Sequence, residues 1–437
     1  MEKFAALSKL GIKYLFRYRK RYGFLFAALV FCFAIVTFIT SVKDGMYENV
    51  YYSAQAHYAG DIIAVGTRPF FPIDYLEEAE AEKILEAINE VPINYTHILQ
   101  RTIFGDRGIV FFNGNAILQK YIIGCDWENE AHLFNQMEFT FPLDENIGDN
   151  SIVLSEPVAN ELGASMGDII ILEVDTIWGQ KNTEFFTVSG IVRDFSLFGY
   201  YKVYVSRTAL NRMLLISDDD CSLIGIFTET RRSAETYRVM LQEALSSKLA
   251  VGELASNRDE ILLFRDNAIA SWQSLVFLYT MPVFLSEISS LLDALNLLTY
   301  FLYSMMLIII VVSAAVTYRL ILHERAKEMG VMRAIGFYGA DLRHVLWVEV
   351  FALGIISLTA GFALAYFLSK IGMLFSFSWF PSFEIFLKNG RLSALYLPQT
   401  VIFNIAITLL VLALAVFFPS LLASKKKLTS LLSGEVL

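Results

Sequence analysis

The stretch YGFLFAALVFCFAIVTFITSV, residues 22–42, contains no charged side chain. A helix rises 1.5 Å per residue, so about 20 apolar residues match a hydrocarbon layer of about 30 Å. A cleaved signal peptide is the alternative, but this run is longer than the apolar core of such a peptide and ends without a small-x-small cleavage site. We therefore expect a retained membrane anchor. The basic residues before it are Lys13, Arg17, Arg19, Lys20 and Arg21.

Three further apolar runs, Leu295–Ile321, His344–Leu368 and Thr400–Leu422, predict three more spans after a long interval. The run at 295–321 is longer than a bilayer requires, so we expect its surplus to continue outside as a stalk. The chain is 55% hydrophobic but carries 44 acidic residues, which excludes both an ordinary soluble globule and a fully buried membrane bundle.

Charge divides the chain into an acidic middle and basic ends. Residues 44–292 hold 16 Lys+Arg and 36 Asp+Glu, a balance of −20, whereas the rest holds 19 and 8, a balance of +11. With four spans, the basic flanks all fall on one side, and Lys and Arg collect in cytoplasmic loops. We expect a multi-pass protein of the bacterial inner (cytoplasmic) membrane, with the N- and C-termini in the cytoplasm. The basic residues of the later flanks are Arg319, Arg325, Lys327, Arg333, Arg343 and Lys425–Lys427.

The acidic middle predicts a large extracytoplasmic α+β domain, because short β-like runs alternate with amphipathic helical ones. At about 250 residues, we expect it to form two lobes on one stem. The predicted fold class is therefore an α-helical membrane protein with four transmembrane helices, one plus three, and this domain. The predicted strands are 61–65, 98–104, 109–112, 117–123, 169–174, 185–192 and 202–205, and the predicted helices are 75–89, 157–162, 207–214 and 233–248.

The expected boundaries follow from these runs. They are a cytoplasmic segment 1–21, a first span 22–42, the extracytoplasmic domain 43–290, a stalk and second span 291–321, a cytoplasmic loop 322–343, a third span 344–368, an outer loop 369–399, a fourth span 400–422 and a cytoplasmic tail 423–437.

Two apolar stretches are too short to span a membrane. Residues 275–285 contain Pro282 and predict either core of the extracytoplasmic domain or a shoulder at the membrane interface. The outer loop is rich in aromatic residues, which favour the interface. These aromatic residues are Phe375, Phe377, Trp379, Phe380, Phe383 and Phe386.

Patterns for catalysis are weak. Residues 163–167 fit the GxSxG nucleophile elbow, but a predicted helix precedes the serine and a strand follows it, the reverse of an elbow. The run Asp218–Asp220 is read as a solvated turn rather than a cation site. No GxxxxGK[ST] occurs, so the chain has no phosphate-binding loop of its own. The histidines have no metal-ligand spacing, and whether Cys125 and Cys221 pair is left open.

The loop between the second and third spans reads HERAKEMGVMRAIG, residues 323–336. Met329, Met332 and Ile335 recur three apart and predict a short amphipathic helix that stops at Gly336. Glu324 and Glu328 lie one turn apart, and cations on a partner surface would relieve their repulsion. A generic cytoplasmic loop, whose charges only set topology, is the alternative.

This segment resembles the ER-x-x-E-[IM]-G-x-[LM]-RA-[IL]-G signature of FtsX-like ABC permeases, which include the macrolide-exporter (MacB-type) and lipoprotein-releasing (LolC/LolE-type) subunits. The third span is similar too, with Glu349 where a glutamate usually opens that helix and Gly354 and Gly361 in its glycine-bearing part. In the tail, Leu421 and Leu422 depart from the family, which has arginines after the proline at the position of Pro419. The residues to which the resemblance assigns contact with an ATPase are Glu324, Arg325, Lys327, Glu328, Met329, Gly330, Arg333 and Gly336. In the extracytoplasmic domain, Leu162-Gly163 and Gly167-Asp168 resemble the family's LG-x-x-x-GD element.

The resemblance implies a MacB-like periplasmic domain and a non-catalytic permease subunit. A dimer of separate ABC ATPase subunits, which bind ATP and magnesium, would push on the loop, and a second permease, identical or related, would complete the unit. The expected cargo is a lipoprotein or a membrane lipid, with a lipoprotein carrier or periplasmic adaptor as a further partner and no nucleic acid. Drug or peptide efflux, an FtsX-like switch of a cell-wall hydrolase, and a receptor without an ATPase are the alternatives.

Overall fold

The computed structural model describes residues 2–193, 199, 201–377 and 386–425, which form two compact units. We call residues 1–46, 293–376 and 391–437 the helical unit, and residues 47–292 and 377–390 the α/β unit. Part of the aromatic loop (Trp379, Phe380 and Phe383) and part of the tail (Lys426 and Lys427) lie outside the described residues.

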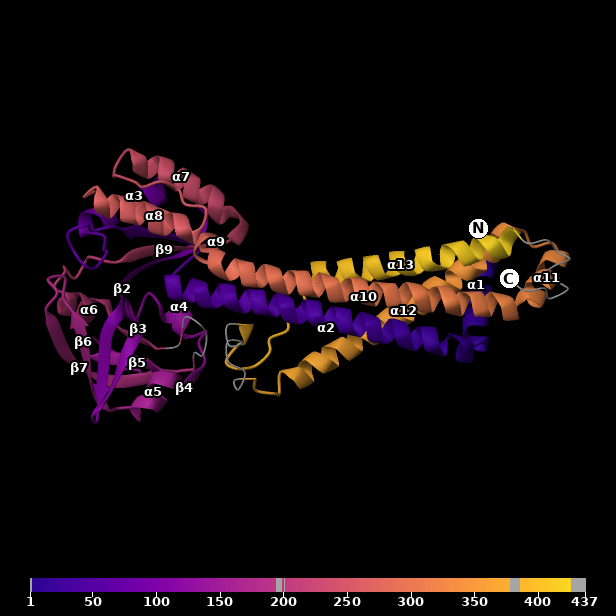
Figure 1. Cartoon of the computed structure of the whole chain (residues 1–437), viewed down its shortest axis with the longest axis horizontal. Coiled ribbons are helices and arrows are strands. Elements are labelled where there is room, and N and C mark those ends of the chain that lie inside the picture. Colours follow the sequence, from indigo (N-terminus) through magenta and orange to yellow (C-terminus); the bar gives the residue numbers. More distant parts are fainter. Residues whose placement is uncertain (1, 194–198, 200, 378–385, 426–437) are drawn as a thin grey trace. The chain divides into compact units, whose positions relative to one another are not determined.

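Four helices within the described ranges are long and apolar enough to cross a membrane. Each predicted span lies inside one of them, so the one-plus-three arrangement is confirmed (Figure 1). The N-terminal segment and the loop at 322–343 each contain a shorter helix. The six helices are α1 (Glu2–Arg17), α2 (Arg19–Tyr58), α10 (Ser286–Glu324), α11 (Ala326–Ala334), α12 (Gly339–Gly372) and α13 (Pro398–Lys425).

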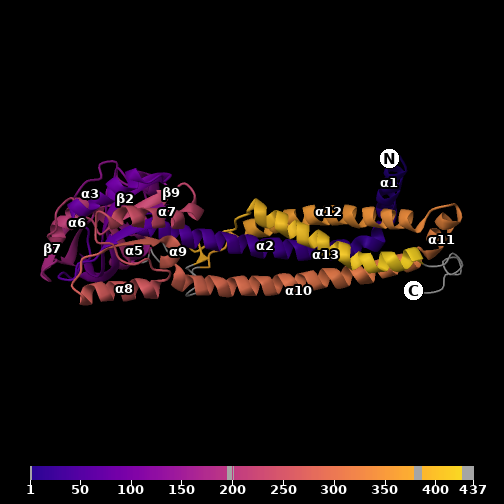
Figure 2. The ribbon, with the colours of Figure 1, turned by 90° about the horizontal axis from the view of Figure 1, so that it is seen from above.

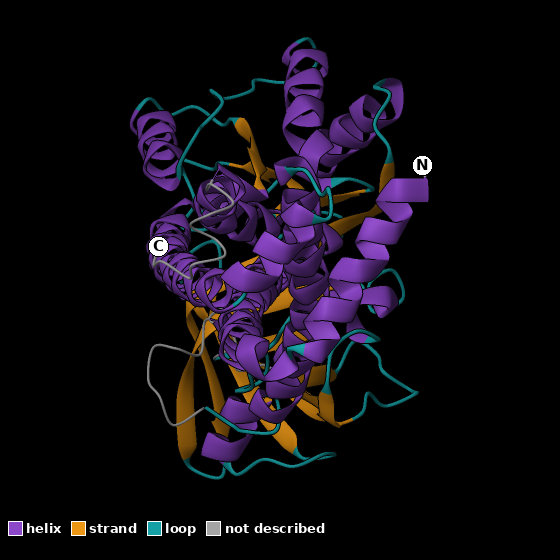
Figure 3. Ribbon diagram, turned by 90° about the vertical axis from the view of Figure 1, so that its right-hand side faces the viewer, coloured by secondary structure: helices purple, strands orange, loops and turns teal. Residues whose placement is uncertain are grey.

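Glycines allow α12 to pack closely on its neighbours. A Cβ at Gly361 would lie 2.9 Å from the carbonyl oxygen of Val30 in α2, so only a glycine fits without a backbone shift. A Cβ at Gly354 would meet the side chains of Leu409 and Leu412 in α13 at 3.0 and 3.1 Å. Figure 2 shows α12 and α13 side by side, and Figure 3 views the helices along their length. Both predicted glycines are therefore sites of close helix packing.

The α/β unit contains a ten-stranded sheet among its described residues. Six of its strands pair in the cyclic order β2-β3-β8-β5-β7-β6-β2 and so close a barrel. Alternating apolar residues fill its interior, and α5 and α6 add Leu162 and Leu210 to the same core. The elements are β2 (Tyr95–Phe112), β3 (Asn115–Cys125), β5 (Ser151–Ser155), α5 (Glu156–Leu162), β6 (Ile169–Asp175), β7 (Lys181–Val192), β8 (Lys202–Ser206) and α6 (Arg207–Leu214).

The first half of β2 also belongs to a second layer, in the order β10-β1-β9-β2. Helices α3 and α7 pack on this layer around one core, and α8 and α9 contribute to another. The division into two lobes is not confirmed, because β2 runs through both regions and the whole forms one compact unit. The elements are β1 (Ile62–Gly66), α3 (Glu78–Glu90), β9 (Leu223–Thr228), α7 (Ala234–Ser246), α8 (Arg258–Ala270), β10 (Val276–Thr280) and α9 (Met281–Phe284). Two short elements, α4 (Ala131–Phe134) and β4 (Phe139–Phe141), complete the unit, β4 at the edge beside β7.

Several sequence predictions need correction. The strands predicted at 98–104 and 109–112 are one strand, β2, whose register shifts between Gly105 and Gly108. The predicted helix at 75–89 begins only at Glu78, because residues 75–77 do not join it and Leu76 pairs with Cys221 in a bridge. The stretch 275–285 is core: β10 is fully buried, which excludes the interfacial shoulder. Strands β4, β5, β9 and β10 and helices α4, α8 and α9 were not predicted.

Local chemistry explains the other motifs. The GxSxG segment is the turn between α5 and β6, with Gly163 and Gly167 at φ of 71° and 85°, so the reversed order is confirmed. Asp220 is buried, not solvated, and its carboxylate accepts hydrogen bonds from the backbone of Glu78 and Ser217 at 3.0 Å each. Burial raises the pKa of Asp220.

The cysteines are free and buried, so Cys125 and Cys221 are not paired.

Candidate functional site

The loop between α10 and α12 folds into a short helix with defined ends. Arg325, at φ −96° and ψ 8°, interrupts the helical path after α10, and α11 follows from Ala326 to Ala334. Gly336 adopts φ 101°, a left-handed conformation that favours glycine and ends the helix. The predicted helix and its stop at Gly336 are therefore present, although Glu324 belongs to α10.

Arg325 is buried and forms an ion pair with Glu349 of α12. Its Nη1 donates to Oε1 and Oε2 of Glu349 at 3.0 and 2.9 Å, and the two side chains are 4% and 0% exposed. The Tyr22 hydroxyl of α2 donates to the same carboxylate at 2.5 Å. A lone carboxylate in an apolar helix is costly, so Glu349 depends on these two partners. Glu349 lies well inside α12 rather than at its opening.

A second carboxylate, Glu328 of α11, faces the same cluster. The Tyr18 hydroxyl donates to its Oε1 at 2.5 Å, and the Arg325 Nε lies 3.6 Å from its Oε2. The hydrogen bond to Glu328 raises the pKa of Tyr18, so the phenol stays a donor at neutral pH. The Arg325 guanidinium also lies over the rings of Tyr14 and Tyr18, 4.4 and 5.5 Å from their centroids. We call Tyr18, Tyr22, Arg325, Glu328 and Glu349 the coupling cluster.

The coupling cluster corrects one expectation. The cations predicted on a partner surface for Glu324 and Glu328 are supplied by the chain itself. Arg21 pairs with Glu324 at 2.9 Å, and Arg325 approaches Glu328. Because α10 ends at Glu324, the two acids also do not share one continuous helix.

The inner face of α11 packs against its neighbours. Met329 and Met332 are buried with Leu322, Leu342 and Leu346 in one apolar cluster, and Gly330 is also buried. Arg325, Met329 and Gly330, three of the residues to which the resemblance assigns contact with an ATPase, are thus buried within the chain.

The outer face of α11 is apolar and exposed. Val331 and Ile335 are 54% and 71% exposed, Tyr338 follows at 74%, and Lys327 lies one turn before Val331. Ile335 recurs at the same spacing as Met329 and Met332 in the sequence, but it follows the end of the helix at Ala334 and is exposed, whereas the two methionines are buried. Val331 and Tyr338 are not among the site residues expected from the sequence. Lys327, Val331 and Ile335 recur four residues apart in the sequence, and this spacing could have indicated that they share one face of the helix. Of the other predicted residues, Gly336 is exposed and Arg333 is half-buried.

Two of the solved structures found similar are a periplasmic region and a domain of a permease protein. One is the periplasmic region of MacB from Actinobacillus actinomycetemcomitans, with 10% identity over 54% of this chain and 95% of that chain and a TM-score of 0.32. Another is a domain of a protein from Porphyromonas gingivalis described as a permease, with 12% identity over 51% and 89% and a TM-score of 0.27. The search of curated proteins gave no match.

Two family models match the chain and together cover most of it. The model of the FtsX-like permease C-terminal region matches residues 300–428, which include α11 and all of α12. The model of the MacB-like periplasmic core domain matches residues 24–253, more than half of the 437 residues. The chain therefore belongs to the FtsX-like, MacB-type family of ABC transporter permeases, a family of membrane proteins that work with ABC ATPase partners.

Proposed function

We propose that this chain is a non-catalytic permease subunit that converts ATP hydrolysis by a separate ATPase into movement of its α/β unit. The observation that carries the proposal is the arrangement of α11, which the Arg325–Glu349 pair fixes to α12 and which exposes Val331 and Ile335 on its other side. An exposed apolar patch on a short helix is suited to a protein groove.

The coupling cluster would pass a displacement of α11 on to two long helices. Arg325 follows directly on α10, Glu349 belongs to α12, and Tyr22 belongs to α2. Helices α2 and α10 each continue from the helical unit into the α/β unit along the chain. A push on α11 would therefore act on the two helices that continue into the α/β unit.

Energy enters this scheme only through differential binding. A partner moves the permease if it binds α11 more tightly in its ATP-closed state than in its open state. We propose that the partner is a dimer of ABC ATPases, which binds ATP and magnesium, and that a second permease completes the unit. In this scheme α11 and both termini lie in the cytoplasm of a bacterium, and the α/β unit lies outside its inner membrane.

For the cargo, we favour a lipoprotein or lipid taken from the outer leaflet. Leu374 and Phe375, at the end of α12, are 78% and 60% exposed, which suits a segment at the membrane interface. Support from the rest of the aromatic loop is weaker than the sequence suggested. Phe386 and Leu387 are buried in the α/β unit, and Asn49 donates to the Leu387 carbonyl at 2.8 Å. Stimulation of the ATPase by lipopeptide, by a drug, or by neither distinguishes release, efflux and signalling.

The coupling role is tested by charging the exposed face of α11. Val331→Asp is expected to weaken co-purification of the ATPase at least tenfold, because an acid replaces an apolar contact while the coupling cluster is untouched. Leu118→Asp is the matched control, since Leu118 is 56% exposed on β3 in the α/β unit. Equal ATPase recovery with the two variants would refute the assignment of α11.

Glu328→Lys and Arg333→Glu address transmission rather than docking. Glu328→Lys places a cation beside Arg325 and removes the acceptor of Tyr18, so we expect ATPase activity without cargo release. Arg333→Glu reverses a half-buried charge near the end of α11, with the same expected result. Full cargo release by both variants in proteoliposomes would exclude this route of transmission.

A further inference from the structure

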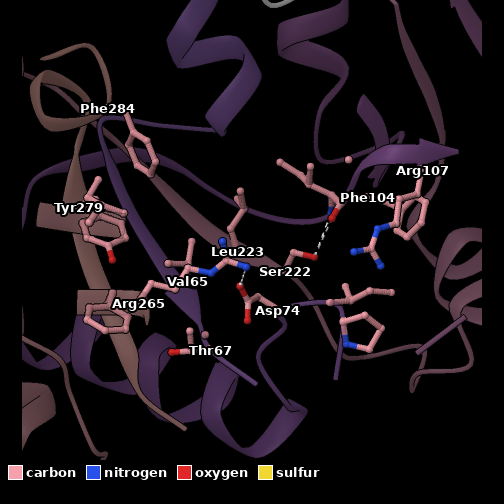
Figure 4. Close-up of a pocket in the computed structure, with 17 residues that line it drawn as sticks. Val65, Thr67, Asp74, Phe104, Arg107, Ser222, Leu223, Arg265, Tyr279 and Phe284 are labelled. Atoms are coloured by element: carbon pink, nitrogen blue, oxygen red, sulfur yellow. Dashed lines mark hydrogen bonds and ion pairs between the residues drawn. The ribbon is translucent and has the colours of Figure 1, made fainter. Parts of the chain in front are cut away.

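The α/β unit contains a cavity of about 510 Å³, away from the coupling cluster, which lies in the helical unit. Small-molecule sites in proteins usually measure about 300–1,000 Å³. The cavity lies where β2 shifts register at Gly105–Gly108, and β1, β9, β10, α8 and α9 supply its other walls (Figure 4). The size is thus suited to a small organic ligand.

One wall of the cavity is apolar and aromatic. Phe104, Phe277 and Tyr279 are almost fully buried, and Ile103 and Phe284 add further carbon surface. Burial raises the pKa of Tyr279, so its hydroxyl remains a protonated donor at neutral pH. These side chains would accommodate an alkyl chain or a ring.

The cavity lining also carries an excess of positive charge. Arg265 of α8 pairs with Asp74 through one nitrogen at 2.8 Å, and the backbone N–H of Arg68 donates to the other Asp74 oxygen at 3.0 Å. The guanidinium of Arg265 therefore keeps donors for a ligand. Arg107, from the register shift in β2, makes no ion pair with any described residue and is exposed. The charged residues of the cavity lining are two arginines and one aspartate, although residues 44–292 as a whole carry a charge of −20.

We propose that this cavity binds a single-chain amphiphile with one anionic head, the head held by Arg107 and Arg265 and the chain lying on Phe104, Phe277 and Tyr279. Arginine suits such a head because its planar donors can bind a carboxylate at two points. The acidic surface of the unit disfavours anions at long range, so recognition depends on contact inside the cavity. This inference goes beyond the proposed function, because it requires no ATPase.

Binding is tested with the full chain in nanodiscs of zwitterionic phospholipid. Decanoate, decylammonium and acetate are titrated by calorimetry, with empty nanodiscs as the background. Decanoate is expected to bind saturably above that background, at least tenfold more tightly than either of the other two. Equal binding of decylammonium, or a decanoate signal no larger than that of empty nanodiscs, would overturn the proposal.

Variants locate the site. Arg107→Glu is expected to weaken decanoate binding at least tenfold, and Ile103→Trp is expected to do the same by filling the cavity. Arg232→Glu, an exposed reversal in the same unit and outside the cavity lining, is expected to leave the Kd within twofold. Unchanged thermal unfolding shows that the variants remain folded. If Arg107→Glu and Ile103→Trp bind decanoate like Arg232→Glu, the cavity is not the site. No ATPase is present, so such a failure is distinct from a failure of the coupling proposal.

Discussion

Each unit contains one arginine–glutamate pair in which both side chains are almost fully buried, among the residues that the structure describes. Arg325 and Glu349 form the pair of the helical unit, and Arg101 and Glu130 form the pair of the α/β unit. The residue types and the burial are the same, but the surroundings differ. From that difference we expect the pair of the α/β unit, the clamp, to stay fixed, and the pair of the helical unit, the switch, to hold α11 on α12 in this arrangement and to change partners when α11 is displaced.

The pair of the α/β unit is fully satisfied. All three guanidinium nitrogens of Arg101 donate: Nε to both Glu130 oxygens at 3.0 Å, Nη2 to the same carboxylate, and Nη1 to the carbonyls of Ala56 and His57 at 2.5 and 3.0 Å. Those carbonyls belong to the last turn of α2, where a cation is favoured. Arg101 therefore fastens the end of α2 to the α/β unit.

The pair of the helical unit is less complete. Arg325 donates to Glu349 through Nη1, while its Nε, the Oε2 of Glu328 and the hydroxyl of buried Tyr318 find no hydrogen-bond partner among the described residues. Unsatisfied buried groups can gain partners in another arrangement. The two pairs are equally buried but differ in how many of their donors and acceptors have partners, and we expect this difference to separate the clamp from the switch.

The largest expected effect is on the clamp. Arg101→Met leaves Glu130 buried without a cation and frees two carbonyls, so the free energy of unfolding of the α/β unit should fall by about 3–5 kcal/mol. Urea unfolding of the full chain, followed by limited proteolysis, measures it. Arg232→Met is the surface control. Exposed ion pairs usually contribute up to about 1 kcal/mol. If the free energy of unfolding fell by less than that, Arg101 and Glu130 would contribute no more than a surface pair and would not be a clamp.

The switch should respond differently. Glu349→Gln keeps the shape and the Tyr22 partner but removes the charge, and we expect a stability loss of about 2 kcal/mol. Arg325 still retains Glu328 and the rings of Tyr14 and Tyr18. ATP-driven cargo release in proteoliposomes should fall at least tenfold, while the ATPase still co-purifies. Suppose instead that Glu349→Gln lowered the free energy of unfolding as much as Arg101→Met does and left cargo release unchanged. Both pairs would then only stabilise the fold.

Helix α2 carries Tyr22 of the switch and ends at the clamp, so its packing on α12 matters to both. Gly361→Ala brings a methyl group against the Val30 carbonyl and should cost about 1–2 kcal/mol, measured by thermal unfolding of the helical unit. Gly23→Ala is the matched control on α2, since nothing lies within 4 Å of its Cβ position. Equal melting of the two variants would show that α2 and α12 are not closely packed at Gly361.

The smallest expected effect is on how the stability of the α/β unit depends on pH. His132 stacks on His97 with ring centroids 3.8 Å apart, and burial lowers its pKa. The unfolded chain then binds the proton at higher pH than the folded one, so stability of the α/β unit is full above about pH 6.5 and falls as the pH drops below it. His132→Phe should flatten the pH dependence of thermal unfolding between pH 7.5 and 5.5. An unchanged slope would assign the acid sensitivity to other groups.

The sequence by itself determined the four spans, the α+β domain and the position of the coupling helix, because these depend on local quantities. An uncharged run such as residues 22–42 is long enough to cross a bilayer. Gly336 can adopt the left-handed conformation that commonly ends a helix. Alternation predicted β3 and β6, but β5, β9 and β10 were missed because they are buried on both faces and show no alternation.

Only the tertiary structure decided which residues meet. Arg325 and Glu349 are 24 residues apart and Tyr22 and Glu349 are 327 apart, so no local pattern could pair them. The same holds for Arg101, whose carbonyl partners lie 44 and 45 residues earlier. The sequence placed Arg325 in a cytoplasmic loop, and the resemblance assigned it to contact with an ATPase. In the structure Arg325 is buried, because the Glu349 carboxylate and the rings of Tyr14 and Tyr18 lie against its guanidinium and offset its desolvation.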